Sequence, residues 1–332
     1  MSELHLTSKI GHDDITQEPI RKGFGRGLKR AGDENDQIVA LCADLTESTQ
    51  MHLFKEAHPE RFVEIGVAEQ NLVTVASGMA HMGKIPFTSS YAAFSPGRNW
   101  EQIRTTIALN EVPVKIVGSH AGVSVGPDGA THQMLEDIAL MRVLPNMVVV
   151  APGDSVEAEK ATLELAKNGQ PSYIRLGREK TPVFTTEKTP FELGRAYVLK
   201  EGKDITLLGT GTMSYQLLHA AKLLKEKGVD AEVVHVPTVK PLDEKTIIAS
   251  VRKTGRAVTA EEAQIAGGFG SAVTELLSEQ LPVPVKRIGM QDRFGESGAP
   301  TELLEHFGLS AEKMVPTIQE FINKVPQYKA GF

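Results

Sequence analysis

Side chains that could do chemistry gather in two segments of this sequence, each following a candidate buried strand. The first, Arg61–Asn71, runs from a strand into a helix of small residues, and Glu69 stands in the first turn of that helix. The second, Gly118–Gln133, is a long glycine-rich loop with three further groups: His120, Asp128 and His132. Loops of this kind at the carboxyl ends of parallel strands commonly carry ligand sites. We expect a ligand site here, the alternatives being that Glu69 only complements the helix dipole and that the histidines are incidental.

Other motifs in the sequence give weaker or negative signals. Gly209-Thr-Gly211 follows a strand and opens a helix, as phosphate-binding turns do. Position 214 is Ser where that motif needs a third glycine, so plain strand-to-helix packing is favoured. The sequence contains no GxxxxGK[ST] or HExxH, and its ten histidines lack the spacing of metal ligands. We predict no metal site in this chain.

Short β-rich runs alternate with helical runs along the chain, and this alternation predicts the elements that hold the two segments. The first set of strand candidates is Ile38–Ala43, Phe62–Ile65, Ile85–Ser89, Val114–Gly118, Met147–Ala151 and Ser172–Arg175. The helical runs are Pro19–Ala31, Ala68–His81, Asn99–Ala108 and Ser155–Lys167. Pro19 and Gly32 are residues that helix ends prefer, so we expect the first helix to end at Ala31.

A second alternating set follows a polar, proline-containing stretch, residues 179–194, that we predict to be a linker. Its runs are Ile205–Leu208, Ser214–Lys227, Ala231–Pro237, Asp243–Lys253, Ala257–Ala260, Gly270–Glu279 and Val285–Ile288, and then Pro300–Phe307 and Glu312–Lys324. Apolar strands that alternate with helices imply largely parallel sheets covered on both faces. We predict an α/β fold of two doubly wound domains, residues 17–178 and 195–332, after a tail of residues 1–16.

Composition limits the function classes. The 332 residues carry a formal net charge of −6, so there is no basic excess that would neutralise a nucleic-acid backbone. The N-terminal stretch lacks the apolar core of a signal peptide, and no apolar run reaches the ~18 residues that a membrane helix needs. The single cysteine, Cys42, excludes an internal disulfide. We expect a cytoplasmic protein without nucleic-acid or membrane partners.

Several multi-residue runs, in order and in spacing, resemble the C-terminal half of transketolase. They are Ala43–Ser48 (ADLTES), His58–Asn71 (HPERFVEIGVAEQN), Pro86–Phe94 (PFTSSYAAF), Gly118–Ala139 (GSHAGVSVGPDGATHQMLEDIA) and Ile174–Arg178 (IRLGR). Pro241-Leu-Asp243 and the run that begins at Glu261 fit the last domain of that family. The resemblance covers residues 17–325 and implies a pyrimidine-binding domain followed by a transketolase C-terminal domain.

The resemblance implies thiamin diphosphate as cofactor and assigns residues to it. Glu69 matches the carboxyl group that hydrogen-bonds the aminopyrimidine ring and so activates the thiazolium carbon, a role that burial beside Ile65 and Val67 would suit. Tyr91 matches the ring that stacks on the pyrimidine, and Phe94 completes the pocket. Asp44 and His132 match positions near the cofactor. The catalytic residues implied are Glu69, His132 and His120.

The implied reaction is transfer of a two-carbon ketol unit between phosphorylated ketose and aldose sugars. Arg21, Ser48 and Arg178 match positions that contact the substrate phosphate, for which arginine is a favoured partner. His120 and Asp128 match positions that bind sugar hydroxyls.

One part of the family pattern is missing from this sequence. The N-terminal domain of a transketolase carries a GDG motif that binds the diphosphate and its metal, and neither Gly32-Asp33-Glu34 nor any other run supplies it. The resemblance therefore implies a split enzyme, with the diphosphate and Mg²⁺ (or Ca²⁺) held by a separate N-terminal subunit in a dimer of heterodimers. Position 263 is Ala where many relatives have His, so that residue's role is not carried over.

Four alternatives stay open at this point. The chain has the length expected for the beta subunit of a 2-oxo-acid dehydrogenase decarboxylase, although the His120–His132 loop with Arg178 suits a phosphosugar better. A deoxyxylulose-phosphate synthase relative and a transketolase for an unusual pentulose phosphate are closer rivals. The last alternative is a non-catalytic scaffold subunit, which would need neither Glu69 nor the loop.

Overall fold

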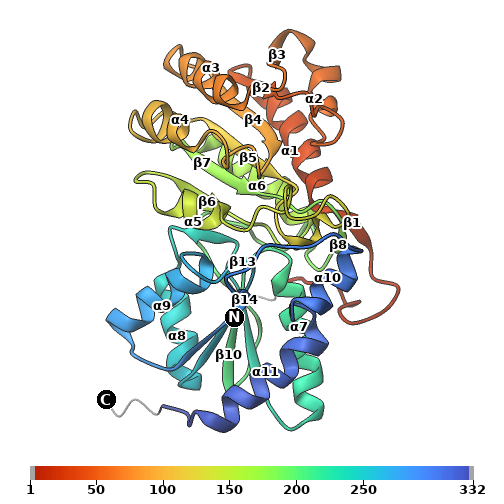
Figure 1. The fold of residues 1–332 in the computed structure, drawn as a ribbon, viewed down its shortest axis with the longest axis vertical. Helices are drawn as coiled ribbons and strands as arrows, with labels where there is room; N and C mark the ends of the chain where they lie inside the picture. Colours follow the sequence, from red (N-terminus) through yellow and green to blue (C-terminus); the bar gives the residue numbers. More distant parts are fainter. Residues whose placement is uncertain (1–3, 329–332) are drawn as a thin grey trace.

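The computed structural model describes residues 4–328, which form two α/β units, one above the other in Figure 1. The first unit is built on a seven-stranded sheet. Its strands, in spatial order, are β12 (Thr238–Lys240), β6 (Val148–Val150), β7 (Ser172–Arg175), β5 (Lys115–Ser119), β4 (Ile85–Tyr91), β2 (Ile38–Cys42) and β3 (Phe62–Glu64). All neighbours run parallel except β12, which pairs antiparallel with β6 and comes from beyond the predicted linker.

Helices cover both faces of this sheet because its strands are apolar on both faces. Along β2, Ile38, Ala40 and Cys42 pack with the helices that begin at Ile20 and Ser155, whereas Val39 and Leu41 pack with the helices that begin at Glu69 and Ile103. The helices are α1 (Ile20–Glu34), α2 (His52–Ala57), α3 (Glu69–His81), α4 (Trp100–Gln102), which continues as a π-helix over Ile103–Ala108, α5 (Asp137–Arg142) and α6 (Ser155–Lys167). Two 3₁₀ turns cover Pro59–Arg61 and Val123–Val125.

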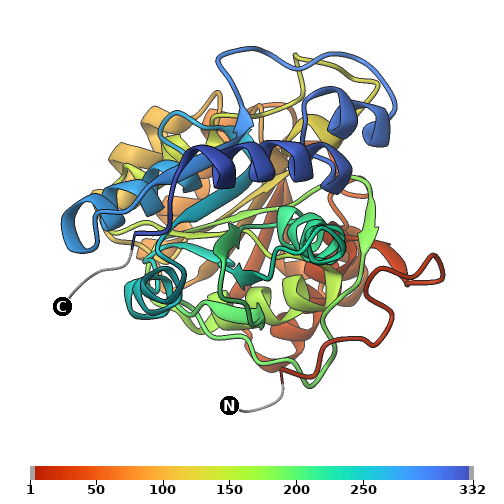
Figure 2. The same cartoon turned by 90° about the horizontal axis from the view of Figure 1, so that it is seen from below.

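The second unit repeats the architecture on a five-stranded sheet. Its strand order is β14 (Val285–Met290), β13 (Ala257–Gln264), β10 (Ile205–Gly209), β11 (Ala231–His235) and β9 (Tyr197–Lys200), with only β9 antiparallel to its neighbour. One face carries α7 (Met213–Glu226) and α11 (Ala311–Lys324), which lie side by side (Figure 2). The other carries α8 (Glu244–Thr254) and α9 (Phe269–Gln280), and α10 (Pro300–His306) lies against the first unit. The predicted α/β class with two largely parallel sheets is confirmed.

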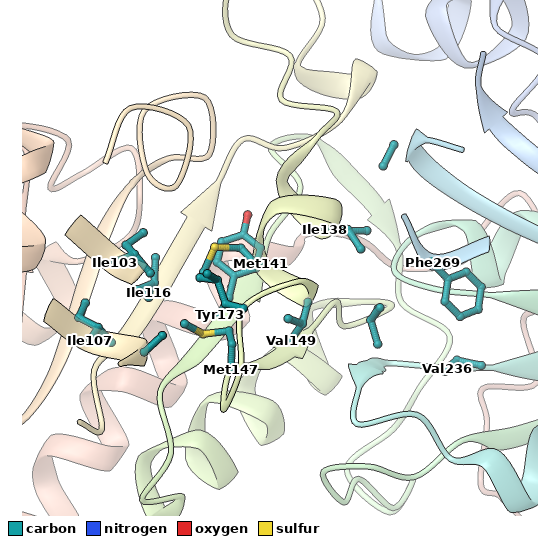
Figure 3. Packing of buried hydrophobic residues seen from close by; sticks show 14 of the residues in the cluster. Ile103, Ile107, Ile116, Ile138, Met141, Met147, Val149, Tyr173, Val236 and Phe269 are labelled. Atoms are coloured by element: carbon teal, nitrogen blue, oxygen red, sulfur yellow. The ribbon is translucent and has the colours of Figure 1, made fainter. Parts of the chain in front are cut away.

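The cores of the two units are continuous. Figure 3 shows one cluster of buried side chains that extends from Ile103 and Ile107, through Tyr173 and Val149, to Phe269 of the second unit. A buried polar contact adds to this junction. The His235 ring lies between the Ser214 hydroxyl (Nδ1–Oγ 2.6 Å) and the Glu157 carboxylate of α6 (Nε2–Oε2 2.7 Å). We conclude that the second unit supports the first unit directly.

Three local features differ from or add to the sequence predictions. Helix α1 does not stop at Ala31 but continues to Glu34. Position 32, inside the helix, needs glycine because a Cβ there would stand 2.5 Å from the Phe54 ring. The predicted linker contains strand β8 (Lys180–Pro182), paired with β1 (Gln17–Pro19). Within the described residues, no helix is both long enough and apolar enough to cross a membrane.

Candidate active site

Predicted site residues meet at the carboxyl ends of the parallel strands in the first unit. Tyr91 ends β4 and His120 follows β5, and their rings stack with centroids 4.0 Å apart. The Ser48 hydroxyl, from the loop after β2, lies 2.8 Å from the Tyr91 hydroxyl and 3.3 Å from His120 Nε2. Phe94 and His132 extend the cluster, with ring centroids 5.4 Å apart in an edge-to-face arrangement. The structure thus joins five residues that the sequence analysis selected from three separate segments.

His120 is held in an unusual state at the centre of this cluster. Its φ of 57° lies in the left-handed region, which non-glycine residues seldom occupy and which is often found at functional sites. Its Nδ1 lies 2.8 Å from the Ser119 hydroxyl, so both ring nitrogens have a hydroxyl neighbour. Burial, and then the charges of Arg21 and Arg178, lower the pKa of His120 to about 3. The ring is therefore neutral near pH 7 and offers one hydrogen-bond donor and one acceptor.

Arg21 and Arg178 form a cationic corner beside this cluster. Arg21 Nε donates to the Arg178 carbonyl oxygen at 3.2 Å, and its Nη1 donates to the Ser48 carbonyl oxygen. Burial and the neighbouring Arg178 charge lower the pKa of Arg21. Within residues 4–328, Arg21 has no carboxylate partner within ion-pair distance. Arg178 lies 3.5 Å from the Glu179 carboxylate and 3.7 Å from the Asp128 carboxylate, whereas Arg21 adds a second guanidinium that no carboxylate of the described residues neutralises. Two neighbouring, half-buried guanidinium groups are suited to an anionic ligand.

Arg178 is also tied to the loop that carries Asp128. Its Nη1 donates to the Val125 carbonyl oxygen at 2.6 Å, and it lies 3.7 Å from an Asp128 carboxylate oxygen. Asp128 itself is exposed at the rim of the loop. The predicted hydroxyl-binding and phosphate-binding residues are therefore neighbours, as one phosphorylated sugar would require.

Glu69 lies at the first residue of α3 and is only 3% exposed. Its neighbours differ from the expectation, because Val67 is 71% exposed and the close partner is a cation. Arg98 Nη1 donates to Glu69 Oε2 at 2.8 Å, and the Arg98 guanidinium lies 4.8 Å from the centre of the Phe94 ring. Asn99 fixes the start of the helix by donating from Nδ2 to the Glu69 carbonyl oxygen at 2.7 Å. A planar N–H donor therefore fits between the Glu69 carboxylate and the Phe94 ring, which is the arrangement that an aminopyrimidine would need.

Asp44 stands apart from the other predicted residues. It is exposed, with a φ of 57°, and its backbone N–H donates to Glu64 Oε1 at 2.8 Å. The same Glu64 carboxylate accepts from the Thr46 hydroxyl and the Gly66 N–H. Within the described residues, Asp44 is hydrogen-bonded to Glu64 and not to the aromatic cluster, so its predicted place near the cofactor stays a prediction.

Sequence reasoning did not find three residues that hold this site. Arg98 pairs with Glu69, Ser119 contacts His120, and Glu64 joins the loops after β2 and β3. Only the glutamate carried a usable signal, since it lies at the end of a predicted strand. Within the described part of the chain, no group of three or more His, Cys, Asp or Glu side chains is arranged to hold a metal ion.

Comparison with known proteins gives a consistent result over nearly the whole chain. Residues 17–183 match the family described as transketolase, pyrimidine binding domain, and residues 194–314 match transketolase, C-terminal domain. A transketolase C-terminal section of Methanocaldococcus jannaschii is 43% identical over 92% of this chain and 96% of its own length. A 6-deoxy-6-sulfo-D-fructose transketolase subunit of a Clostridium species is 43% identical over 86% of this chain and 89% of its own length.

A solved structure agrees with these sequence matches. It is described as a split gene transketolase, inactive beta4 tetramer, and superposes with a TM-score of 0.87 at 45% identity, covering 93% of this chain and 99% of that one. These relatives agree with the two consecutive domains of the fold. They also agree with the aromatic and cationic cluster at the strand ends of the first unit. The chain belongs to the transketolase family and corresponds to its C-terminal section.

Proposed function

We propose that this chain is the C-terminal subunit of an enzyme that transfers a two-carbon ketol unit between phosphorylated sugars. The observation that carries the proposal is the corner formed by Arg21 and Arg178, which stands beside neutral His120 and stacked Tyr91. The anion of a polyhydroxylated, anionic ligand would pair with the two arginines, and its hydroxyl groups would pair with His120. A short or branched 2-oxo acid is also an anion, but it has no hydroxyl groups for His120 and Asp128 to bind.

Members of this family generally use thiamin diphosphate with a divalent metal, and the cofactor supplies a nucleophilic carbon that holds the ketol unit. In this chain, Tyr91 and Phe94 would flank the pyrimidine ring, and Glu69 would take a hydrogen bond from it in place of Arg98. Arg98 is free to leave because its side chain is 51% exposed. We propose that a separate N-terminal subunit binds the diphosphate and metal, as expected for a split enzyme.

The remaining residues bind and orient the sugar. His120 donates from one ring nitrogen and accepts at the other, so it can fix a hydroxyl without adding charge. Asp128 would offer a further hydroxyl contact, and Arg178, Arg21 and Ser48 would hold the terminal anion. His132 lies against the Phe94 ring, on the side of the cluster where the reacting carbons would meet the cofactor.

A second candidate substrate is favoured by one of the relatives. The Clostridium protein is described as a subunit acting on 6-deoxy-6-sulfo-D-fructose, a sugar that carries a sulfonate. A sulfonate is also an anion with oxygen acceptors, so Arg21 and Arg178 suit it as well as a phosphate. We propose anionic ketoses as the substrate class and phosphorylated pentuloses as the first members to test.

The test is a coupled assay of this chain with its N-terminal subunit, thiamin diphosphate and Mg²⁺. Xylulose 5-phosphate with ribose 5-phosphate is the first pair, and 6-deoxy-6-sulfo-fructose replaces the donor in a parallel series. Ketol transfer from either anionic donor supports the proposal. Decarboxylation of a 2-oxo acid without ketol transfer, or no turnover with any anionic ketose, would replace it with the dehydrogenase or scaffold alternatives.

Substitution of Arg178 tests the phosphate role within the same assay. Losing a charge-assisted contact costs about 1.5–3 kcal/mol, so Arg178→Ala should raise KM for phosphorylated acceptors by about 10-fold to 150-fold. KM for an unphosphorylated hydroxyaldehyde should change far less. Lys180→Ala, which removes an exposed cation two residues away, is the matched control. Equal penalties for both kinds of acceptor would show that Arg178 does not bind the phosphate.

A further inference from the structure

The loop that carries the predicted sugar-binding residues is hydrogen-bonded to the second unit. We call residues 118–133 the substrate loop. The Ser124 N–H donates to Glu262 Oε1 at 2.6 Å, and Glu262 belongs to β13 of the second unit. At the other end of the loop, Gln133 Nε2 donates to the Glu296 carbonyl oxygen at 2.8 Å. The position of this loop therefore depends on residues outside the unit that contains the site.

Glu262 is held through both its side chain and its backbone. It is 4% exposed, its Oε2 accepts from the Thr212 hydroxyl at 3.2 Å, and its backbone oxygen accepts from Arg175 Nη2 at 2.7 Å. Arg175 is itself paired with buried Asp137 at 2.8 Å. The carboxylate therefore cannot move without breaking its contacts with Ser124 and Thr212. Its short hydrogen bond to Ser124 is of the strong, charge-assisted kind.

The loop is shaped to receive this carboxylate. Gly122 has a φ of +90°, and a Cβ at that position would stand 2.3 Å from Glu262 Oε1. Only glycine allows both the backbone conformation and the close approach. Glu262 contacts the loop at Ser124, and at the next residue the Val125 carbonyl oxygen accepts from Arg178 Nη1 at 2.6 Å. A continuous path of contacts thus runs from Glu262, through the Ser124–Val125 backbone, to Arg178.

We infer that Glu262 is a positioning residue for substrate binding: it sets the place of the substrate loop, and thereby of Arg178 and Asp128, from the C-terminal unit. It touches neither substrate nor cofactor in this arrangement. Through Glu262, the second unit would take part in positioning the substrate loop, a role that its fold alone does not indicate. Its kinetic consequence rests on the proposed function, whereas its structural consequence does not.

The chain offers a matched control on the same strand. Glu261 is fully buried, and its carboxylate accepts from the Phe269 N–H at 2.6 Å and the Gly270 N–H at 2.8 Å. Because neighbouring residues of a strand face opposite ways, these contacts lie within the second unit and away from the loop. Glu261→Ala therefore removes a buried carboxylate with backbone partners, as Glu262→Ala does, but leaves the Ser124 contact in place.

The structural test is amide hydrogen exchange in the isolated chain. Glu262→Ala should accelerate exchange in peptides covering residues 122–133 by about tenfold or more, whereas Glu261→Ala should leave those peptides at the wild-type rate. Glu262→Gln keeps an acceptor for the Ser124 N–H and should restore most of the protection. If Glu262→Ala does not fold, Glu262→Asp, whose carboxylate is withdrawn by one methylene, takes its place. Unchanged loop exchange in the variant that folds, or equal acceleration in Glu261→Ala, would overturn the inference.

The kinetic test uses the complex with the N-terminal subunit. Glu262→Ala (or Glu262→Asp) should raise KM for a phosphorylated ketose by about tenfold, a change of about 1.4 kcal/mol, with a smaller effect on kcat and with rescue by Glu262→Gln. Loop exchange that responds while the wild-type complex is inactive would reject the proposed function and keep the positioning contact. An active wild type whose KM is unchanged by a loosened loop would reject the positioning role alone.

Discussion

Glu69 is held by side chains from one short segment, Ser95–Asn99, that follows the aromatic cluster. Arg98 pairs with its carboxylate and Asn99 with its carbonyl oxygen, while Asn99 Nδ2 also donates to the Ser95 hydroxyl at 3.1 Å. The segment therefore fixes both the start of α3 and the direction of the carboxylate. In the proposed mechanism this carboxylate exchanges a guanidinium partner for the pyrimidine ring.

Glu69→Ala should reduce ketol transfer by about 100-fold or more, the usual loss for a general acid–base residue. The fold should persist, because the partner left behind, Arg98, is half exposed and can be hydrated. The measurement is turnover of the reconstituted complex, with circular dichroism to check folding. Glu101→Ala, which removes an exposed carboxylate from the neighbouring helix, serves as control. Wild-type turnover by a folded Glu69→Ala complex would remove Glu69 from the mechanism.

His120 predicts a specific acid sensitivity. Its folded-state pKa of about 3 lies below the ordinary value of 6.5, so the unfolded state binds more protons between these two values. The stability that neutral His120 contributes is complete above pH ~6.5 and is lost as the pH falls toward 3. Between pH 6 and 4, the free energy of unfolding of the wild type should fall more steeply than that of His120→Asn, by up to about 1.4 kcal/mol per pH unit. Denaturant titrations at several pH values measure this difference, and equal slopes would mean that His120 is not held neutral.

At the scale of elements, the packing of α1 on α6 fixes the position of Arg21. The two helices approach so closely that a Cβ at Gly23 would stand 1.7 Å from the Ser155 carbonyl oxygen, and one at Gly27 would stand 2.8 Å from the Glu159 carbonyl oxygen. The backbone of α1 is therefore held against the start of α6, with Arg21 near its N-terminal end. Any widening of this contact moves Arg21 away from Ser48 and Arg178.

Gly23→Ala should destabilise the chain by about 1–3 kcal/mol, the usual cost of overpacking. Gly78 in α3 is the matched control, since it is exposed and a Cβ there meets nothing within 4 Å. Gly78→Ala should be neutral or stabilising by up to about 1 kcal/mol, because alanine is the better helix former. Denaturant midpoints of the two variants measure the difference, and similar midpoints would mean that the close contact of α1 and α6 carries little energy.

The elements that the sequence predicted are those with a strong local signal. The apolar strands of both sheets were found within a few residues, and α6 has the predicted bounds, with Asp154 capping it through a hydrogen bond from the Glu157 N–H. The strands that were missed, β1, β8, β9 and β12, have three or four residues each and are defined by distant partners. Gly32 was misread as a helix end because tight packing and helix termination both select glycine.

Some residues of the candidate site could also be predicted from the sequence, and others could not. Tyr91, His120, Ser48, Arg21 and Arg178 were all selected from sequence, and the structure brings them together. Arg98 could not be selected, because only the folded turn after Phe94 brings it back to Glu69. Glu261 and Glu262 look equivalent in sequence, and only the strand geometry separates one that stays within its own unit from one that reaches the substrate loop.

At the scale of the whole molecule, the proposed function requires a second chain. We propose that Arg21 and Arg178 bind the sugar anion, and the diphosphate of the cofactor would then need cationic and metal partners from elsewhere. Val67 is 71% exposed only two residues before buried Glu69, and we expect a partner that completes the cofactor site to cover it. The resulting interface should be of the large, obligate kind, on the order of 2,000 Å² or more.

The measurement that tests this account most directly is titration of the isolated chain with its N-terminal subunit, at fixed thiamin diphosphate and Mg²⁺. The account predicts no ketol transfer from this chain alone, activity that rises as the partner is added, and saturation at one partner per chain, with calorimetry giving the same stoichiometry. Full turnover by this chain alone, freed of any co-purified subunit, would contradict it.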